Sequence, residues 1–209
     1  MRLVFALLFA LSAAACGGLF KTERSASTAY SLAVPTAPAL SPQLTSVLIV
    51  HRPTAAPGLE TERVVVAFPD GRTEPYAGVR FTAPVPELVQ SALTESLRAR
   101  GGWRAVVDER GDYGGQFRVQ TEIREFTALA ATPDSTPRVR VRLIGVVTRP
   151  HGGELLVPVA ATGEAQASDL KQSAVIAAFD AALGAALAQY GEAIYAACAG
   201  AAPPQAPGH

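Results

Sequence analysis

Two stretches of the sequence alternate apolar and polar side chains with a period of two. In residues 117–124 Phe, Val, Thr and Ile alternate with Arg, Gln and Glu, and in residues 138–143 arginine alternates with valine and leucine. A β-strand turns successive side chains to opposite faces. Each stretch therefore predicts a strand with one face in the core and one face in water. The rest of the fold must cover the first face and leave the second exposed.

Five further stretches predict strands because they are short and rich in β-branched or aromatic residues. They are residues 46–53, residues 62–68, a segment ending at Phe81, residues 103–107 and residues 155–161. Pro158 lies inside the last stretch and has no N–H group for a ladder hydrogen bond. We therefore expect that strand at an edge of the sheet or at a bulge.

The hydrophobic period changes to that of a helix in two places. After Pro84 an apolar face recurs every three or four residues until Gly101, which predicts the end of the helix. A second helix is predicted after Ser168, its N-cap, with Asp169 near the positive end of the helix dipole. Its apolar stripe consists of Ile176, Phe179, Leu183, Leu187, Tyr190 and Ile194. Polar residues interrupt the other side, so the stripe predicts packing on the sheet and not a membrane span.

The amino end has the pattern of an export signal. Arg2 is followed by an apolar run over residues 3–11 and by small residues up to Ala15. Two peptidases can read this pattern. The first is the ordinary one, which would release a soluble secreted protein. The second is the lipoprotein peptidase, because small residues followed by Cys16 and Gly17 resemble a bacterial lipobox. Since a lone exposed thiol is a liability in an oxidising compartment, we expect residues 1–15 to be a lipoprotein signal peptide and Cys16 to be the lipidated residue.

Composition divides the remaining chain into a tether, one domain and a tail. Residues 16–43 are rich in Ser, Thr, Ala and Pro and predict a flexible tether. Residues 44–198 have the size of an ordinary single domain, and residues 199–209 predict a disordered tail. The 18 basic and 18 acidic residues give a formal net charge of +0. A nucleic-acid partner is therefore not expected, since such partners require a basic surface.

Arg138, Arg140 and Arg142 form a ladder on the solvated face of one predicted strand. Cross-strand pairing with acidic residues explains such a ladder, and Glu122 is the partner expected if the two alternating strands pair. Charged side chains also protect a sheet from aggregation. The alternative is a surface that binds anionic lipid or a partner protein.

The residue pattern does not predict catalytic chemistry. His51, His151 and His209 lack the spacing of metal ligands, and the sequence has neither a G-x-S-x-G nucleophile motif nor a P-loop. Asp108, Glu109 and Asp112 are interpreted as solvated loop carboxylates. We therefore predict that the protein is not an enzyme and has no catalytic, cofactor or metal site. Cys198 is either a buried thiol on the last helix or the source of an intermolecular disulfide.

Four blocks of the sequence resemble those of one family. They are "RPTAAPGLETERVVV", "PYAGVRFTAPVPELVQSALTESL", "FRVQTEIREF" and "AVIAAFDAALGAALA". In this order, from Tyr30 to about Tyr195, they resemble the ABC-type transport auxiliary lipoprotein family, which includes the lipoprotein subunit of paraquat-inducible and Mce-type lipid transport systems. The resemblance implies an α+β fold, a two-layer α/β sandwich whose mostly antiparallel or mixed sheet is covered by two helices. This architecture is similar to the amino-terminal domain of TolB.

The resemblance also implies a role in the cell envelope. The expected function is that of a non-enzymatic, lipid-anchored periplasmic auxiliary component of an ABC/Mce-type lipid transport system. The expected partners are a Mce-domain protein, an ABC permease and an ATPase, with phospholipid and a homo-oligomer as further candidates. Gly17, the second residue of the mature chain, favours the outer membrane over the inner one. The alternatives are a structural or assembly lipoprotein of the pilotin or secretion-associated type and, third, a hydrolase.

Overall fold

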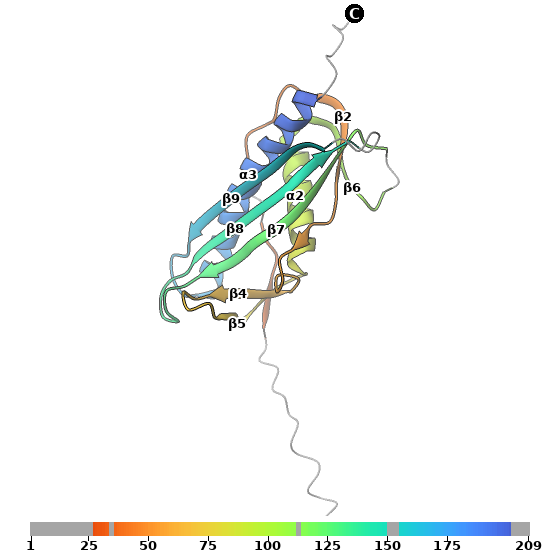
Figure 1. Ribbon diagram of the computed structural model, residues 1–209. Coiled ribbons are helices and arrows are strands. Elements are labelled where there is room, and N and C mark those ends of the chain that lie inside the picture. The colour runs from red at the N-terminus through yellow and green to blue at the C-terminus, as the bar shows by residue number, and fades with distance from the viewer. Residues whose placement is uncertain (1–26, 34–35, 112–113, 150–154, 202–209) are drawn as a thin grey trace, which may run out of the picture.

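One mixed sheet and two helices make up the fold (Figure 1). The computed structural model describes residues 27–33, 36–111, 114–149 and 155–201. Within these residues the strands are β1 (Thr28–Tyr30), β2 (Leu44–Val50), β3 (Thr54–Ala55), β4 (Arg63–Ala67), β5 (Thr73–Phe81), β6 (Trp103–Asp108), β7 (Phe117–Leu129), β8 (Arg138–Thr148) and β9 (Leu155–Gln166). The helices are α2 (Val85–Arg100) and α3 (Gln172–Ala201). Both lie on the same side of the sheet, which confirms the predicted two-layer α+β sandwich.

Strand β7 organises the sheet. One of its edges pairs antiparallel with β8, which pairs antiparallel with β9. Its other edge pairs in succession with β2, β3 and β4, all parallel to it. The sheet continues from β2 to β6 and from β4 through β5 to β1. Among the described residues β9 pairs with β8 only. The edge position predicted from Pro158 is thereby confirmed.

Strand β7 is longer than the alternation predicts and contains a change of register. The pairing with β8 shifts between Ile123 and Glu125, so that Glu125 lies opposite Arg142. A bulge of this kind places two successive residues against one on the partner strand. The alternation resumes after it, with Phe126 and Ala128 buried. The period of two over residues 117–124 therefore describes only the first part of the strand.

The core lies between the sheet and the two helices. Phe81 of β5, Phe126 of β7 and Phe179 of α3 pack against one another with ring centroids 5.1 to 5.6 Å apart. The hydroxyl groups of Tyr190 and Thr121 lie 3.1 Å apart inside this core and form a hydrogen bond. A buried tyrosine needs such a partner because an unpaired hydroxyl group is costly in an apolar environment.

The last helix differs from its prediction at its start. It begins at Gln172, so Ser168 is not its N-cap. The Asp169 carboxylate instead accepts a hydrogen bond of 2.6 Å from the N–H of Lys171, which forms a turn before the helix. By length and composition α3 could cross a membrane, but 56% of its most apolar window is buried inside the protein. The helix packs along β8 and β9 as the stripe predicts (Figure 1).

Part of the predicted tether is folded onto the domain. Within residues 28–43, β1 pairs with β5, and the N–H of Ala33 donates to the Asp180 carboxylate at 2.8 Å. Further along, the N–H of Leu40 donates to the carbonyl of Arg100 at 2.8 Å. We call residues 28–33 and 36–43 the strap. These hydrogen bonds explain why Ser-, Thr- and Pro-rich residues are ordered here, and the domain boundaries themselves stay a prediction.

Candidate functional site

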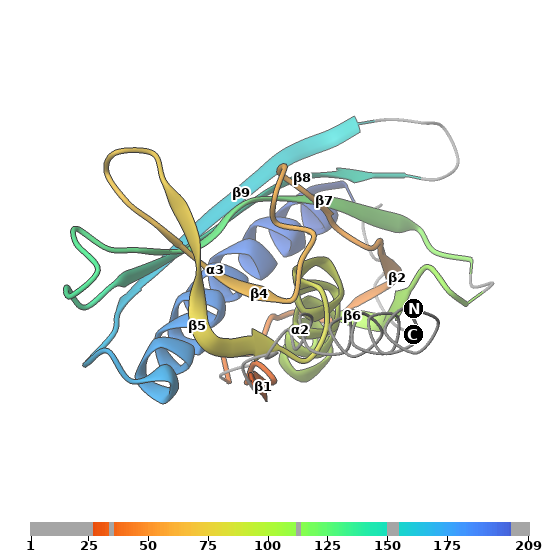
Figure 2. The same cartoon turned by 90° about the horizontal axis from the view of Figure 1, so that it is seen from below.

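Within the described residues no helix covers the side of β7, β8 and β9 that points away from α3 (Figure 2). We call this side the uncovered face. On β8 the positions that face the helices, Val139, Val141 and Leu143, are fully buried, whereas Arg138 and Arg142 on the other side of the strand are exposed. The uncovered face is therefore the solvated side that the alternation predicts, and it is the surface available to a partner or ligand.

The uncovered face has a charged half and an apolar half. The outward positions of β8 are, in order, Arg138, Arg140, Arg142, Ile144 and Val146. The positions opposite them on β9 are Gln166, Glu164, Thr162, Ala160 and Pro158. Both strands change from charged or polar to apolar at the same level of the sheet. If the outward positions had stayed polar along both strands, the whole face would be hydrophilic.

Ion pairs occupy the charged half. The Nε atom of Arg140 lies 2.6 Å from Glu164, and Arg140 also reaches Glu125 at 3.6 Å. The hydrogen bond to Glu164 raises the pKa of Arg140, which stays protonated. Cross-strand pairing thus accounts for the arginine ladder. The acidic partners are Glu125 and Glu164 and not Glu122, because Glu122 lies opposite Ile144 and the bulge in β7 brings Glu125 opposite Arg142.

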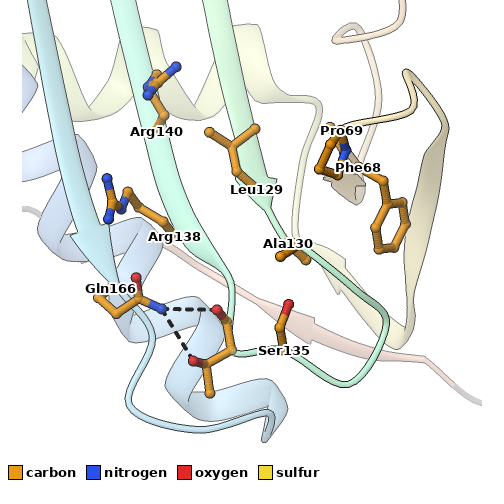
Figure 3. A pocket seen from close by; sticks show the side chains of 11 residues that line it. Phe68, Pro69, Leu129, Ala130, Ser135, Arg138, Arg140 and Gln166 are labelled. Atoms are coloured by element: carbon orange, nitrogen blue, oxygen red, sulfur yellow. Dashed lines mark hydrogen bonds between the residues drawn. The ribbon is translucent and has the colours of Figure 1, made fainter.

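A pocket of about 480 Å³ lies at the end of the charged half (Figure 3). Leu129, Ala130 and Pro69 give it apolar surface. The Nε2 group of Gln166 donates to the carbonyl oxygens of Thr136 at 3.0 Å and Pro137 at 3.1 Å, so this amide holds the β7–β8 hairpin. Because the Gln166 amide already has protein partners, the pocket is a weak candidate for ligand binding.

A larger depression covers the apolar half. It measures about 870 Å³, and we call it the trough. Ile144, Val146, Pro158 and Ala160 supply its outward apolar side chains. The segment after β2 contributes His51 and Arg52, β3 contributes Thr54, and β7 contributes the polar Gln120 and Glu122. This volume is within the range of small-molecule sites, which are mostly apolar with a few polar groups. Of the depressions described on this face, the trough is the strongest candidate site.

Of the three histidines considered in the sequence, the structure places His51 at the trough. His51 lines the trough, and its Nε2 atom is buried without a hydrogen-bond partner. His151, His209 and Cys16 lie outside the described residues. Across the part of the chain that the structure describes, no three His, Cys, Asp or Glu side chains form a group that could hold a metal ion.

Glu109 has a structural role that its interpretation as a solvated carboxylate missed. It accepts a hydrogen bond of 2.6 Å from the side chain of Gln90 and one of 3.0 Å from the N–H of Arg52. It therefore ties the wall of the trough to α2. Asp108 accepts a hydrogen bond from the N–H of Arg110 in its own turn, and Asp112 lies outside the described residues.

Arg100 is a central residue that sequence reasoning did not single out. Its side chain is 2% exposed. The guanidinium donates to the carbonyl oxygens of Pro38 and Ala188, both at 2.8 Å, and to Glu192 at 3.2 Å. It thus joins the strap, α2 and α3. In the sequence Arg100 resembles an ordinary basic residue at the end of a helix, and no pattern indicates its burial.

The structure favours the buried thiol over the disulfide for Cys198. This residue is fully buried in the core, and burial raises the pKa of its thiol to about 12. A thiol with this pKa has almost no reactive thiolate at neutral pH.

In a Cys16→Ser chain Cys198 is the sole thiol. We expect this variant to react with a thiol reagent only when urea unfolds it. Rapid reaction of the folded protein at pH 8 would show that the thiol is accessible.

The comparisons with known proteins agree with this architecture. Residues 30–192 match the family model of the ABC-type transport auxiliary lipoprotein component. Protein XCC0632 from Xanthomonas campestris has a similar structure, with a TM-score of 0.71 and 21% identity over 81% of this chain and 96% of that chain. A second, uncharacterized protein has a TM-score of 0.52 and 14% identity over 77% of this chain and 97% of its own. At these identities the two structures establish similarity of fold.

The search of curated proteins gave no match. The family match extends from the end of β1 into α3 and so includes most of the strap, strands β2 to β9 with the uncovered face, α2 and the larger part of α3. Because it spans more than half of the chain, the protein belongs to the family of ABC-type transport auxiliary lipoprotein components.

Proposed function

We propose that this protein is a non-enzymatic, lipid-anchored auxiliary component of an ABC/Mce-type lipid transport system in the bacterial envelope. The observation that carries the proposal is the family match over residues 30–192, which begins shortly after the lipobox-like sequence ending at Cys16. The family description supplies both the lipoprotein character and the association with ABC transport. The Mce-type system and the lipid cargo are our extension of it.

In this proposal Cys16 receives the lipid and anchors the domain. The apolar run over residues 3–11 and the small residues before Cys16 support export and processing at this position. Gly17 supports sorting to the periplasmic face of the outer membrane. The chain reaches the folded domain at β1, at the β4–β5 end of the sheet (Figure 1). From there the strap follows the domain, hydrogen-bonded to Asp180 of α3 and to Arg100 of α2.

The proposal assigns energy conversion to other subunits. The sequence contains no P-loop, so a separate ATPase would hydrolyse ATP and a separate permease would cross the membrane. A Mce-domain protein is the partner that would hold the lipid in transit. The uncovered face and the edge of β9 offer surface for such contacts, since both are exposed.

Co-purification from membranes tests the function. We expect the full-length protein to recover the permease, the ATPase and the Mce-domain protein. The Cys16→Ser variant should leave the membrane fraction and lose these partners, because a protein without its acyl chains has no membrane anchor. Cys198→Ala is the matched control: it also removes a thiol but should retain both the membrane location and the partners. Recovery of a secretin in place of transport subunits would favour the assembly lipoprotein and contradict the proposal.

A further inference from the structure

The apolar half of the uncovered face lacks a covering element among the described residues. Four neighbouring outward positions on β8 and β9 are apolar, although the same strands carry Arg, Glu, Thr and Gln at their other outward positions. Pro158 and Ala160 of this group are exposed, and Ile144 and Val146 are half-buried. Contiguous exposed apolar surface on a sheet face is typical of a binding site.

The floor of the trough suits a hydrocarbon better than a peptide. The backbone groups of β8 are used in ladders with β7 and β9 on its two sides. The trough lies on the face of these strands and not along a free edge, so its floor has few backbone groups to offer. A peptide bound there would leave its own N–H and C=O groups unpaired, which is costly, whereas an acyl chain has none.

A cation lies where the trough ends. A second depression, of about 530 Å³, is lined by Ala160 together with Arg142, Arg140 and Glu125, so Ala160 belongs to both depressions. The Arg142 side chain is 54% exposed, and its ion pair with Glu125 measures 3.9 Å. Arg140, by contrast, is held at 2.6 Å by Glu164. Of the two arginines that line this second depression, Arg142 is therefore the one whose guanidinium can turn to a phosphate, to which arginine binds in bidentate geometry.

We propose that the uncovered face binds one glycerophospholipid, with an acyl chain in the trough and the phosphate at Arg142. The apolar floor and the adjoining guanidinium match the two parts of this ligand. The choice of a phospholipid over another amphiphile rests on the proposed transport function. The position of the site rests only on the change from charged to apolar residues along β8 and β9 and on the two adjoining depressions.

Photo-crosslinking of the full-length protein in cells tests the site. A photoreactive benzoylphenylalanine replaces Ala160 in one strain and, as the control position, Arg138 in another, and the cells grow with radioactive phosphate. Arg138 is also outward on these strands but lines neither the trough nor the second depression. We expect the purified protein to carry phosphate label after irradiation at position 160 and little at position 138. The lipid anchor contains no phosphate, so it does not contribute to the label.

Charge reversal at the two ends of the ladder then tests the headgroup contact. With the probe at position 160, Arg142→Glu should lower the label about tenfold, as expected for the loss of a charge-assisted hydrogen bond. Arg138→Glu should leave the label unchanged. Equal label at positions 160 and 138, insensitivity to Arg142→Glu, or an adduct of protein size only would overturn the site. The outcome of the co-purification is independent: if transport subunits are absent while the label follows Arg142, the transport function fails and the lipid site stands.

Discussion

The Gly163→Ala substitution is expected to destabilise the protein by about 3 kcal/mol or more. A Cβ atom at this position of β9 would lie 1.9 Å from the carbonyl oxygen of Ala182 and 2.6 Å from the backbone nitrogen of Ala186. Both are backbone atoms of α3, so neither can rotate away as a side chain would. The helix would have to move off the sheet, and the packing around Phe179 and Leu183 would loosen with it.

Urea unfolding followed by the fluorescence of Trp103, the single tryptophan, measures this effect. Gly114→Ala is the control, because a Cβ atom at Gly114 meets nothing within 4 Å. We expect the control to change the free energy of unfolding by no more than about 0.5 kcal/mol. If the two variants unfold at the same urea concentration, the close approach of β9 and α3 is wrong.

Replacing Arg100 by methionine is expected to cost about 3 kcal/mol. Methionine keeps the apolar stem but removes the guanidinium, so the carbonyl groups of Pro38 and Ala188 lose their donor. The strap loses its central contact with the helices. Beyond the loss of stability, we therefore expect limited proteolysis to cut within residues 36–43 of Arg100→Met well before the wild-type protein is cut there.

Glu192→Gln separates the ion pair from the buried hydrogen bonds. The Glu192 side chain is 62% exposed, so its ion pair with Arg100 is largely screened by water. This variant should lose less than about 1 kcal/mol and keep the strap protected from proteolysis. Equal losses for Arg100→Met and Glu192→Gln would mean that the surface ion pair, and not the hydrogen bonds to the strap and α3, accounts for the role of Arg100.

The parts of the fold that the sequence predicts are those with a regular period. The alternation over residues 117–124 and 138–143 predicts the sheet and its solvated face, and the stripe from Ile176 to Ile194 predicts the helix that covers the other face. Both are confirmed. The period fails at the β7 bulge, where one inserted residue brings Glu125 opposite Arg142, whereas the expected partner Glu122 lies opposite Ile144.

The candidate site is hidden from sequence reasoning for the same physical reason. After Leu143 both faces of β8 are apolar, so the period of two disappears, although the strand continues to Thr148. From the sequence alone, the outward residues Ile144 and Val146 therefore resemble core residues. Their position on the uncovered face follows only from the pairing with β7 and β9.

Long-range contacts are equally invisible in the sequence. Arg100 and Gly163 act through residues more than a dozen positions away along the chain. Arg100 donates hydrogen bonds to Ala188 and Glu192 of α3. Gly163 has no Cβ atom, and this allows the backbone of Ala182 to approach β9 closely. The alanines of α3 that permit this approach resemble the many other alanines of the chain. Only the packed structure separates the alanines that contact β9 from those that face water.

The central claim is that this domain works from a lipid anchor, and the mass of the mature amino-terminal peptide tests it most directly. The measurement is mass spectrometry of the protein purified from membranes. The account predicts a chain that begins at Cys16 and carries a diacylglyceryl group on its sulfur. A mature chain whose Cys16 thiol is unmodified, or one that begins at another residue, would contradict it.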